Sequence, residues 1–181
     1  AITMLQAISA TRATPLVRPS GLVAPEIMRL LDAGAYGIIC PMISTEEDAR
    51  DLVRASRYPP LGERSFGPAR GTLYGGADYL HHANDEILVL AMIETRAGLD
   101  NLDAILAVEG IDGVYVGPND LGLALGEAPA NEPTAPIVVE AIEHIRATTI
   151  ARGLIAGIFC SDGPAAAMRT AQGFNLVTPG N

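Results

Sequence analysis

The chain has 181 residues, of which 49% are hydrophobic and 18% charged, and its formal net charge is −9. This length and apolar content suit a single domain with a sizeable core. All 12 basic residues are arginines, which excludes lysine Schiff-base chemistry, a pyridoxal-phosphate anchor and a P-loop lysine. The acidic balance and the absence of tryptophan argue against a nucleic-acid partner.

The sequence opens on a segment of helical character, residues 2–10, and then alternates short apolar runs with segments of helical periodicity. The apolar runs are residues 14–20, 37–42, 87–94, 113–118, 154–160 and 175–180. Helices are expected at residues 25–32, 45–57, 97–108, 135–152 and 163–172, and a long loop at 62–76. Runs that are apolar almost throughout suit strands buried on both faces, so the pattern predicts an α/β fold with a parallel sheet.

Six strands leave two architectures open. One is a doubly wound open sheet. The other is a (β/α)₈ barrel that lacks strands one and two and the last helix, since a complete barrel needs eight strands. Periodicity alone does not choose between them.

The cellular setting is predicted from what the sequence lacks. No uncharged apolar run approaches the ~18 residues of a membrane span, and no signal-peptide pattern opens the sequence. Cys40 and Cys160 each lie in an apolar run. We therefore expect a cytoplasmic protein with no membrane partner and with both cysteines reduced in the core.

Three charged residues stand where apolar runs end, which is where α/β proteins build their sites: Arg18, Glu94 and Asp120. Two carboxylates at neighbouring strand ends favour a cation between them, and oxygen ligands alone suit Mg²⁺ or Mn²⁺. Arg18 offers a planar fork for a carboxylate or an enolate oxygen. The turn at residues 117–120 could direct backbone N–H groups at an anion.

The alternative interpretation of these residues is structural. Arg18 and Glu94 would form a salt bridge, and Asp120 would cap the next helix. Pattern alone leaves both interpretations open.

Several motifs in order resemble the HpcH/HpaI aldolase family, the metal-dependent class II pyruvate aldolases that include 4-hydroxy-2-oxoheptanedioate aldolases. The resemblance covers essentially the whole chain. Its strongest stretches are MIET at 92–95, NLD at 101–103, IDGVYVGPNDL at 111–121 and LG at 125–126. Others are VRP at 17–19, LLDAGA at 30–35, PM at 41–42, RYPPLGERSFGP at 57–68 and YL at 79–80.

This resemblance implies a (β/α)₈ TIM barrel, here one domain over residues 1–181 that is incomplete at both ends, and a homo-oligomer, a hexamer in that family. It implies Glu94 and Asp120 as ligands of a divalent cation (Mg²⁺, Mn²⁺ or Co²⁺) and Arg18 as the catalytic residue that holds the keto oxygen of pyruvate. The implied substrate-binding residues are Arg18, Gly117, Pro118, Asn119 and Asp120. The implied reaction is reversible aldol cleavage of a 4-hydroxy-2-oxo acid to pyruvate and an aldehyde.

The sequence also departs from the family pattern. In the family, the second strand ends in an acid and a histidine involved in proton transfer, and that segment would precede Ala1. One alternative is therefore a non-catalytic or impaired subunit or fragment that binds metal and a keto acid. Another is a citrate-lyase-like carbon–carbon lyase acting on a CoA thioester, although the absence of lysine disfavours its basic groove.

The loop at residues 62–76 carries two further arginines, Arg64 and Arg70. They could meet the aldehyde or a neighbouring subunit. We favour a solvated loop with local ion pairs.

Overall fold

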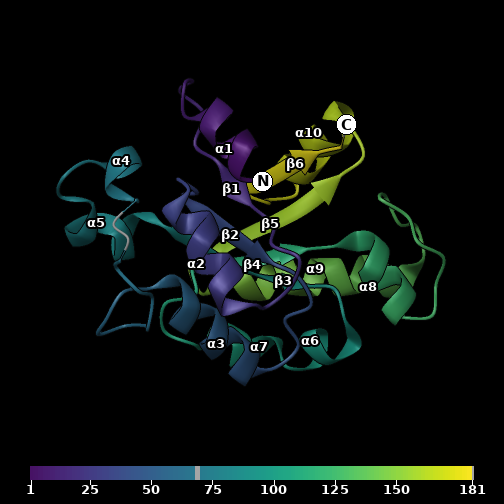
Figure 1. Cartoon of the computed structure of the whole chain (residues 1–181). Coiled ribbons are helices and arrows are strands. Elements are labelled where there is room, and N and C mark those ends of the chain that lie inside the picture. The colour runs from purple at the N-terminus through teal and green to yellow at the C-terminus, as the bar shows by residue number, and fades with distance from the viewer. Residues whose placement is uncertain (68–69, 181) are drawn as a thin grey trace.

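The computed structural model describes residues 1–67 and 70–180, and within them it forms a parallel α/β structure (Figure 1). The strands are β1 (Leu16–Val17), β2 (Gly37–Cys40), β3 (Leu88–Ile93), β4 (Gly113–Val116), β5 (Ile155–Cys160) and β6 (Leu176–Pro179). The helices are α1 (Ile2–Ile8), α2 (Ala24–Asp32), α3 (Glu46–Ser56), α4 (Thr72–Gly75), α5 (Tyr79–Glu86), α6 (Arg96–Asp100), α7 (Leu102–Leu106), α8 (Pro118–Ala124), α9 (Pro136–Ala151) and α10 (Gly163–Ala171).

The sheet is open, so the prediction of an eight-stranded barrel is wrong for this chain. Its six strands are all parallel and lie in the order β1-β2-β3-β4-β5-β6. Closure requires the two edge strands to pair, whereas β1 pairs with β2 and β6 with β5. The described residues therefore form a half-barrel. Strand order that follows chain order is what a barrel also has, which is why the sequence pattern resembled one.

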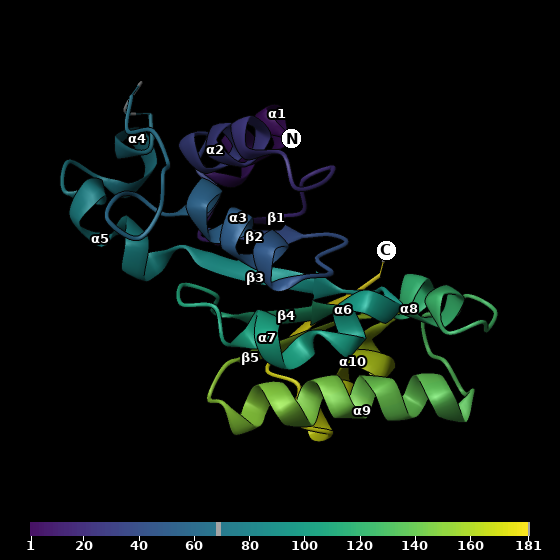
Figure 2. The same cartoon turned by 90° about the horizontal axis from the view of Figure 1, so that it is seen from below.

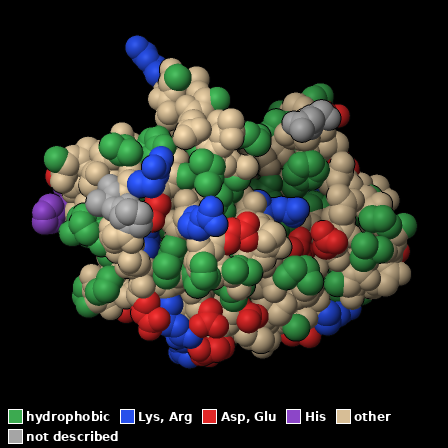
Figure 3. All heavy atoms as spheres, in the orientation of Figure 1, with side chains coloured by type: hydrophobic (Ala, Val, Ile, Leu, Met, Phe, Trp, Pro, Cys, Tyr) green, Lys and Arg blue, Asp and Glu red, His purple; other side chains and the backbone are tan. Residues whose placement is uncertain are grey.

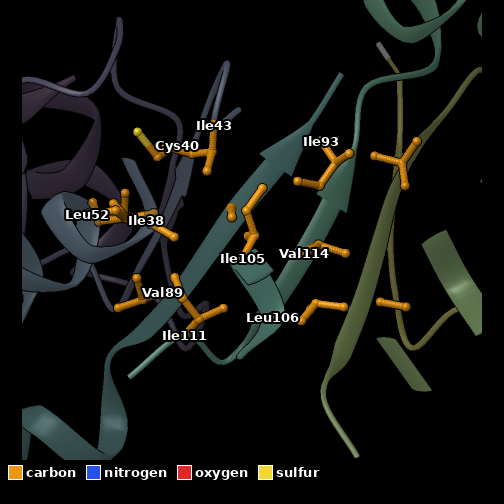
Figure 4. Close-up of a cluster of buried hydrophobic side chains, with 14 of the residues drawn as sticks. Ile38, Cys40, Ile43, Leu52, Val89, Ile93, Ile105, Leu106, Ile111 and Val114 are labelled. Atoms are coloured by element: carbon orange, nitrogen blue, oxygen red, sulfur yellow. The ribbon is translucent and has the colours of Figure 1, made fainter. Parts of the chain in front are cut away.

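The outer face of the sheet is covered by helices, among them α2, α3, α7, α9 and α10 (Figures 1 and 2). Alternate strand residues point to this face and pack against the helices. Figure 4 shows Ile38, Val89 and Val114 from three neighbouring strands in one layer with Leu52 of α3 and Ile105 of α7. The central strands β2, β3 and β4 are buried on both faces almost throughout, which is why they carry near-continuous apolar runs. The edge strands β1 and β6 are only partly buried.

The inner face of the sheet carries the other strand residues. A second, smaller apolar cluster there contains Ile39, Leu90, Met92 and Tyr115, with Leu16, Ile155, Phe159 and Leu176 packed beside it. This face leads up to the carboxyl ends of the strands, where the predicted site residues lie.

Two features of the chain agree with the sequence analysis. α3 lies within the helix expected at 45–57, and Thr45 caps it: its Oγ1 accepts the Asp48 N–H at 3.1 Å, and the Asp48 carboxylate accepts the Thr45 N–H at 2.9 Å. Cys40 and Cys160 are both buried and free. No helix of the described residues is long and apolar enough to cross a membrane.

The segment expected as a loop at 62–76 is only partly a loop. It contains α4, and its residues 68 and 69 lie outside the described part of the chain. Arg70 is exposed, but Arg64 is 2% exposed, so a solvated loop is wrong for Arg64. Its guanidinium pairs with Asp32 at 2.8 Å, donates to the Tyr79 hydroxyl at 2.9 Å and lies 4.4 Å from the centre of the Tyr58 ring. Arg64 thus ties this segment to the end of α2.

Candidate active site

Glu94 is the buried acid of the site. It directly follows β3 and is 2% exposed. Its Oε1 accepts the backbone N–H of Met42 at 2.9 Å, whereas its buried Oε2 has no hydrogen-bond partner among residues 1–67 and 70–180. Burial raises the pKa of Glu94, and the Asp120 carboxylate raises it further, while the Met42 N–H and Arg18 act in the opposite direction. Glu94 is therefore a buried carboxylate with one unused oxygen.

Met42, which follows β2, supplies the hydrogen bond to Glu94 from an unusual backbone conformation. Its φ is 60°, in the left-handed region that non-glycine residues rarely occupy. Strained backbone of this kind costs of order 1–3 kcal/mol and is concentrated at functional sites. The strand end at Met42 is thus shaped to direct an N–H at the Glu94 carboxylate.

Gly117 lets the end of β4 approach the end of β3. A Cβ atom at this position would lie 2.4 Å from Glu94 Oε2 and 2.6 Å from the Met92 Cε, so a side chain does not fit. α8 begins at the next residue, and Asp120 lies in its first turn. The carboxylates of Glu94 and Asp120 are thereby brought to adjacent strand ends, close enough for one to shift the pKa of the other.

Arg18 is exposed at the end of β1, and no hydrogen bond or ion pair to the described residues holds its guanidinium. Its charge nevertheless acts on the pKa of both Glu94 and Tyr115. The structural alternative is therefore not formed: Arg18 and Glu94 make no salt bridge, and Asp120 does not cap α8 with its side chain. The three charged groups converge without pairing one another.

These residues surround a cavity of about 400 Å³. Five predicted substrate-binding residues line it: Arg18, Gly117, Pro118, Asn119 and Asp120. The remaining lining comes from the inner face of the sheet, namely Leu16, Ile39, Met92, Tyr115, Phe159 and Thr178. Glu94 lies behind Gly117 rather than on the cavity wall. In the view of Figure 3, acidic and basic side chains lie side by side across the middle of the molecule.

A hard divalent cation fits the donors present. Oε2 of Glu94 is a buried oxygen without a partner, and the Asp120 carboxylate faces the same end of the sheet. The described residues contain no group of three or more His, Cys, Asp or Glu side chains that could hold a metal ion. Two carboxylates with the other positions left to water and substrate oxygens is the arrangement that Mg²⁺ commonly accepts.

Sequence reasoning missed two features of this site. The Met42 N–H has no sequence signal, because nothing in a methionine predicts a left-handed backbone. The other is the hydroxyl pair of Tyr115 and Thr178, which are hydrogen-bonded to each other in the cavity wall although they are far apart in the chain. Only the order and register of the strands bring such residues together.

Comparisons with known proteins agree with this geometry. The HpcH/HpaI aldolase/citrate lyase family profile matches residues 1–180. The chain is 49% identical over 175 residues to a hydroxypyruvate/pyruvate aldolase of Rhizorhabdus wittichii and 43% identical over 164 residues to a 4-hydroxy-2-oxo-heptane-1,7-dioate aldolase of Salmonella arizonae. These matches cover 97% and 89% of this chain, and 70% and 62% of the relatives.

A solved structure shows the same fold. The chain superposes with a TM-score of 0.89 and 33% identity on a HpcH/HpaI aldolase/citrate lyase family protein of Burkholderia cenocepacia, covering 98% of this chain and 72% of that one. The resemblance inferred from the sequence motifs is confirmed. This chain belongs to the HpcH/HpaI aldolase/citrate lyase family.

Proposed function

We propose that this chain is the catalytic part of a divalent-metal-dependent aldolase, which cleaves a 4-hydroxy-2-oxo acid reversibly to pyruvate and an aldehyde. The observation that carries the proposal is the unpartnered, buried Oε2 of Glu94 behind Gly117, with Asp120 lining the cavity and close enough to raise the pKa of Glu94. The aldolase names of the two relatives support the reaction class.

Glu94 and Asp120 are the residues that would hold the cation. When bound there, Mg²⁺ or Mn²⁺ supplies Lewis-acid polarisation of the 2-keto oxygen. The Met42 N–H keeps one Glu94 oxygen occupied and so fixes the direction of the other. The strained turn at Met42 is in this way a positioning device for the ligand set.

Arg18 would bind the keto oxygen and stabilise the negative charge that develops there when a proton leaves the methyl group. Its guanidinium is free of internal partners in the described chain, so both of its N–H edges can face the substrate. The backbone N–H groups at Asn119 and Asp120, in the first turn of α8, would receive the carboxylate of pyruvate.

A divalent cation (Mg²⁺, Mn²⁺ or Co²⁺), a cytoplasmic location and assembly into a homo-oligomer stay predictions of the sequence.

Pyruvate release tests the proposal. The purified chain should release pyruvate from a 4-hydroxy-2-oxo acid with added Mn²⁺ and not with EDTA. Glu94→Gln should lose this activity, and its affinity for Mn²⁺ should fall. The fall should be at least roughly tenfold, because loss of a residue that only hydrogen-bonds to a metal ligand already weakens metal affinity by that factor. Glu109→Gln, an exposed acid away from the cavity, is the matched control. Absence of metal-dependent release by the full polypeptide would favour a non-catalytic subunit instead.

The role of Arg18 is tested separately by exchange of the pyruvate methyl protons with solvent, followed by NMR. Arg18→Ala should slow exchange by about 100-fold, the scale on which loss of one oxyanion donor acts, and should leave Mn²⁺ affinity unchanged. Arg12→Ala, at another exposed position, serves as the control. Exchange at the wild-type rate in Arg18→Ala would remove Arg18 from the mechanism.

A further inference from the structure

Two hydroxyl groups meet in the part of the cavity wall that comes from β4 and β6. Tyr115 of β4 is 5% exposed, and its hydroxyl is hydrogen-bonded to Thr178 Oγ1 of β6. Both residues line the cavity, and their neighbours in that wall are apolar, such as Phe159. A polar pair in an otherwise apolar wall marks a place where a polar group can be received.

The contact between Tyr115 and Thr178 is possible because β5, which lies between their strands, has a glycine without a side chain at Gly157. Tyr115 is in register with Gly157, so the tyrosine ring crosses β5 to reach the next strand. A Cβ at Gly157 would lie 2.7 Å from Cδ2 of Tyr115, which leaves no room for a side chain there. Thr178 is in register with Phe159, at the carboxyl end of β5. The hydroxyl pair therefore lies toward the mouth of the cavity, where Gly117 and Asp120 also are.

One of the two hydroxyl protons is not used in the hydrogen bond between Tyr115 and Thr178. Each hydroxyl carries one O–H donor and can accept as well, and a hydrogen bond between two hydroxyls uses one of the two protons. The other proton, and the remaining lone pairs, can face the cavity. A substrate hydroxyl that lies here exchanges its water partners for this donor and acceptor.

The charged groups of the site lie at other strand ends than β5 and β6, so the wall that contains the hydroxyl pair is available to the second reactant, the aldehyde. Arg18, Glu94 and Asp120 come from the ends of β1, β3 and β4, and the proposed function assigns them to the 2-oxo acid and the cation. The wall formed by β5 and β6 carries no charged residue among those that line the cavity. Under the proposed function, this uncharged wall is the part of the cavity left for the aldehyde.

We propose that the Tyr115–Thr178 hydroxyl pair is a specificity subsite that recognises a hydroxyl group on the acceptor aldehyde. This inference rests on the proposed function and adds the substrate class to it: a short hydroxylated aldehyde is preferred over an apolar one of the same size.

Aldol addition to pyruvate with two matched aldehydes tests the subsite. Glycolaldehyde and propanal differ by a hydroxyl in place of a methyl group. The ratio of kcat/KM for glycolaldehyde to that for propanal should fall about fivefold to tenfold in Thr178→Val and in Tyr115→Phe, as expected for one neutral hydrogen bond. Thr178→Ser keeps a hydroxyl and should keep most of the ratio, which separates hydroxyl recognition from packing.

Thr170→Val, the same change on the exposed face of α10, is the matched control and should leave the ratio unchanged. An unchanged ratio in both Thr178→Val and Tyr115→Phe would overturn the subsite, as would an equal loss with both aldehydes. Exchange of the pyruvate methyl protons in the wild-type chain is measured alongside. If exchange occurs and the ratio does not move, the subsite alone fails; if exchange is absent, the proposed function fails and the subsite with it.

Discussion

A carboxylate without a partner is costly to bury, and at Glu94 the chain maintains one. Among the described residues its Oε2 has no hydrogen-bond partner, and the charge of Asp120 further disfavours ionisation. Met42 adopts a left-handed backbone to satisfy only the other oxygen. The cation of the proposed function would supply the partner that this oxygen lacks.

The pKa of Glu94 leads to a prediction for the metal-free chain. Because burial raises its pKa above the ordinary 4.5, the stability that protonated Glu94 contributes is complete below that pH and is lost as pH rises through the folded-state pKa. Glu94→Gln cannot ionise, so its free energy of unfolding relative to wild type should increase as the pH rises above 4.5, and the two chains are compared from about pH 5 to about pH 8. Urea unfolding in EDTA measures this difference.

The matched control for that measurement is Glu109→Gln, whose difference from wild type should stay constant over the same range because Glu109 is exposed. A Glu94→Gln difference that is equally flat would contradict the raised pKa of Glu94.

Cys40 carries a second prediction at the residue scale. Burial, aided by Asp48, Glu26 and Glu94, raises the pKa of the Cys40 thiol to about 12. At pH 8 only about one thiol in 10⁴ would be ionised, and the thiolate is the reactive form. In the Cys160→Ala chain, Cys40 should therefore not react with a disulfide reagent until urea unfolds the protein. Rapid reaction of the folded chain would show that the thiol is accessible and ionised.

The sequence predicted the charged residues of the site but not its supporting contacts. Arg18, Glu94 and Asp120 were found because a charge at the end of an apolar run is visible in one dimension. The Met42 N–H and the Tyr115–Thr178 pair depend on a backbone angle and on strand register, which a single sequence does not encode locally.

At the scale of elements, strands were predicted better than helices. Each of the six predicted apolar runs contains one of the six strands, because burial on both faces leaves a continuous signal. The helix expected at 97–108 is instead two, α6 and α7, interrupted at Asn101. The Asn101 side chain donates to the Ser44 carbonyl at 2.9 Å, a tertiary contact that overrides helical periodicity.

The ion pair of Arg64 with Asp32 is a tertiary contact whose contribution to stability can be tested. Arg64→Met keeps much of the side chain's bulk but leaves Asp32, whose side chain is 17% exposed, without its ion-pair partner. Breaking a buried pair from one side costs about 3–5 kcal/mol, so the free energy of unfolding should fall by that amount. Urea denaturation followed by circular dichroism gives the value.

Arg50→Met on α3 is the comparison, since Arg50 pairs with Glu46 at the surface. The free energy of unfolding should fall much less in Arg50→Met than in Arg64→Met. Equal losses would mean that Arg64 does not hold the 62–76 segment to α2.

At the scale of the whole molecule, closure of the sheet could not be read from the sequence. A barrel and an open half-barrel both consist of parallel strands in chain order with helices on one face, and they share the same periodicities. What separates them is whether β1 and β6 have second partners, and that property lies at the edges of the sheet. The motif resemblance identified the family correctly, but the closed barrel that it implied is not formed by the described residues.

The site and the core belong to one cooperative unit, so binding at the site should stabilise the whole chain. The main apolar cluster runs without interruption from Leu5 of α1 to Ala165 of α10, and the site residues extend from three of its strands. At a Mn²⁺ concentration of about 100 times Kd, binding adds about 2.7 kcal/mol, which for a domain of this size raises Tm by roughly 5–10 °C. The Tm followed by far-UV circular dichroism and the Tm followed by the near-UV tyrosine signal should rise together on addition of Mn²⁺. In Glu94→Gln neither Tm should rise. A shift in one signal alone would show that the half-barrel unfolds in parts and that the site is not coupled to its core.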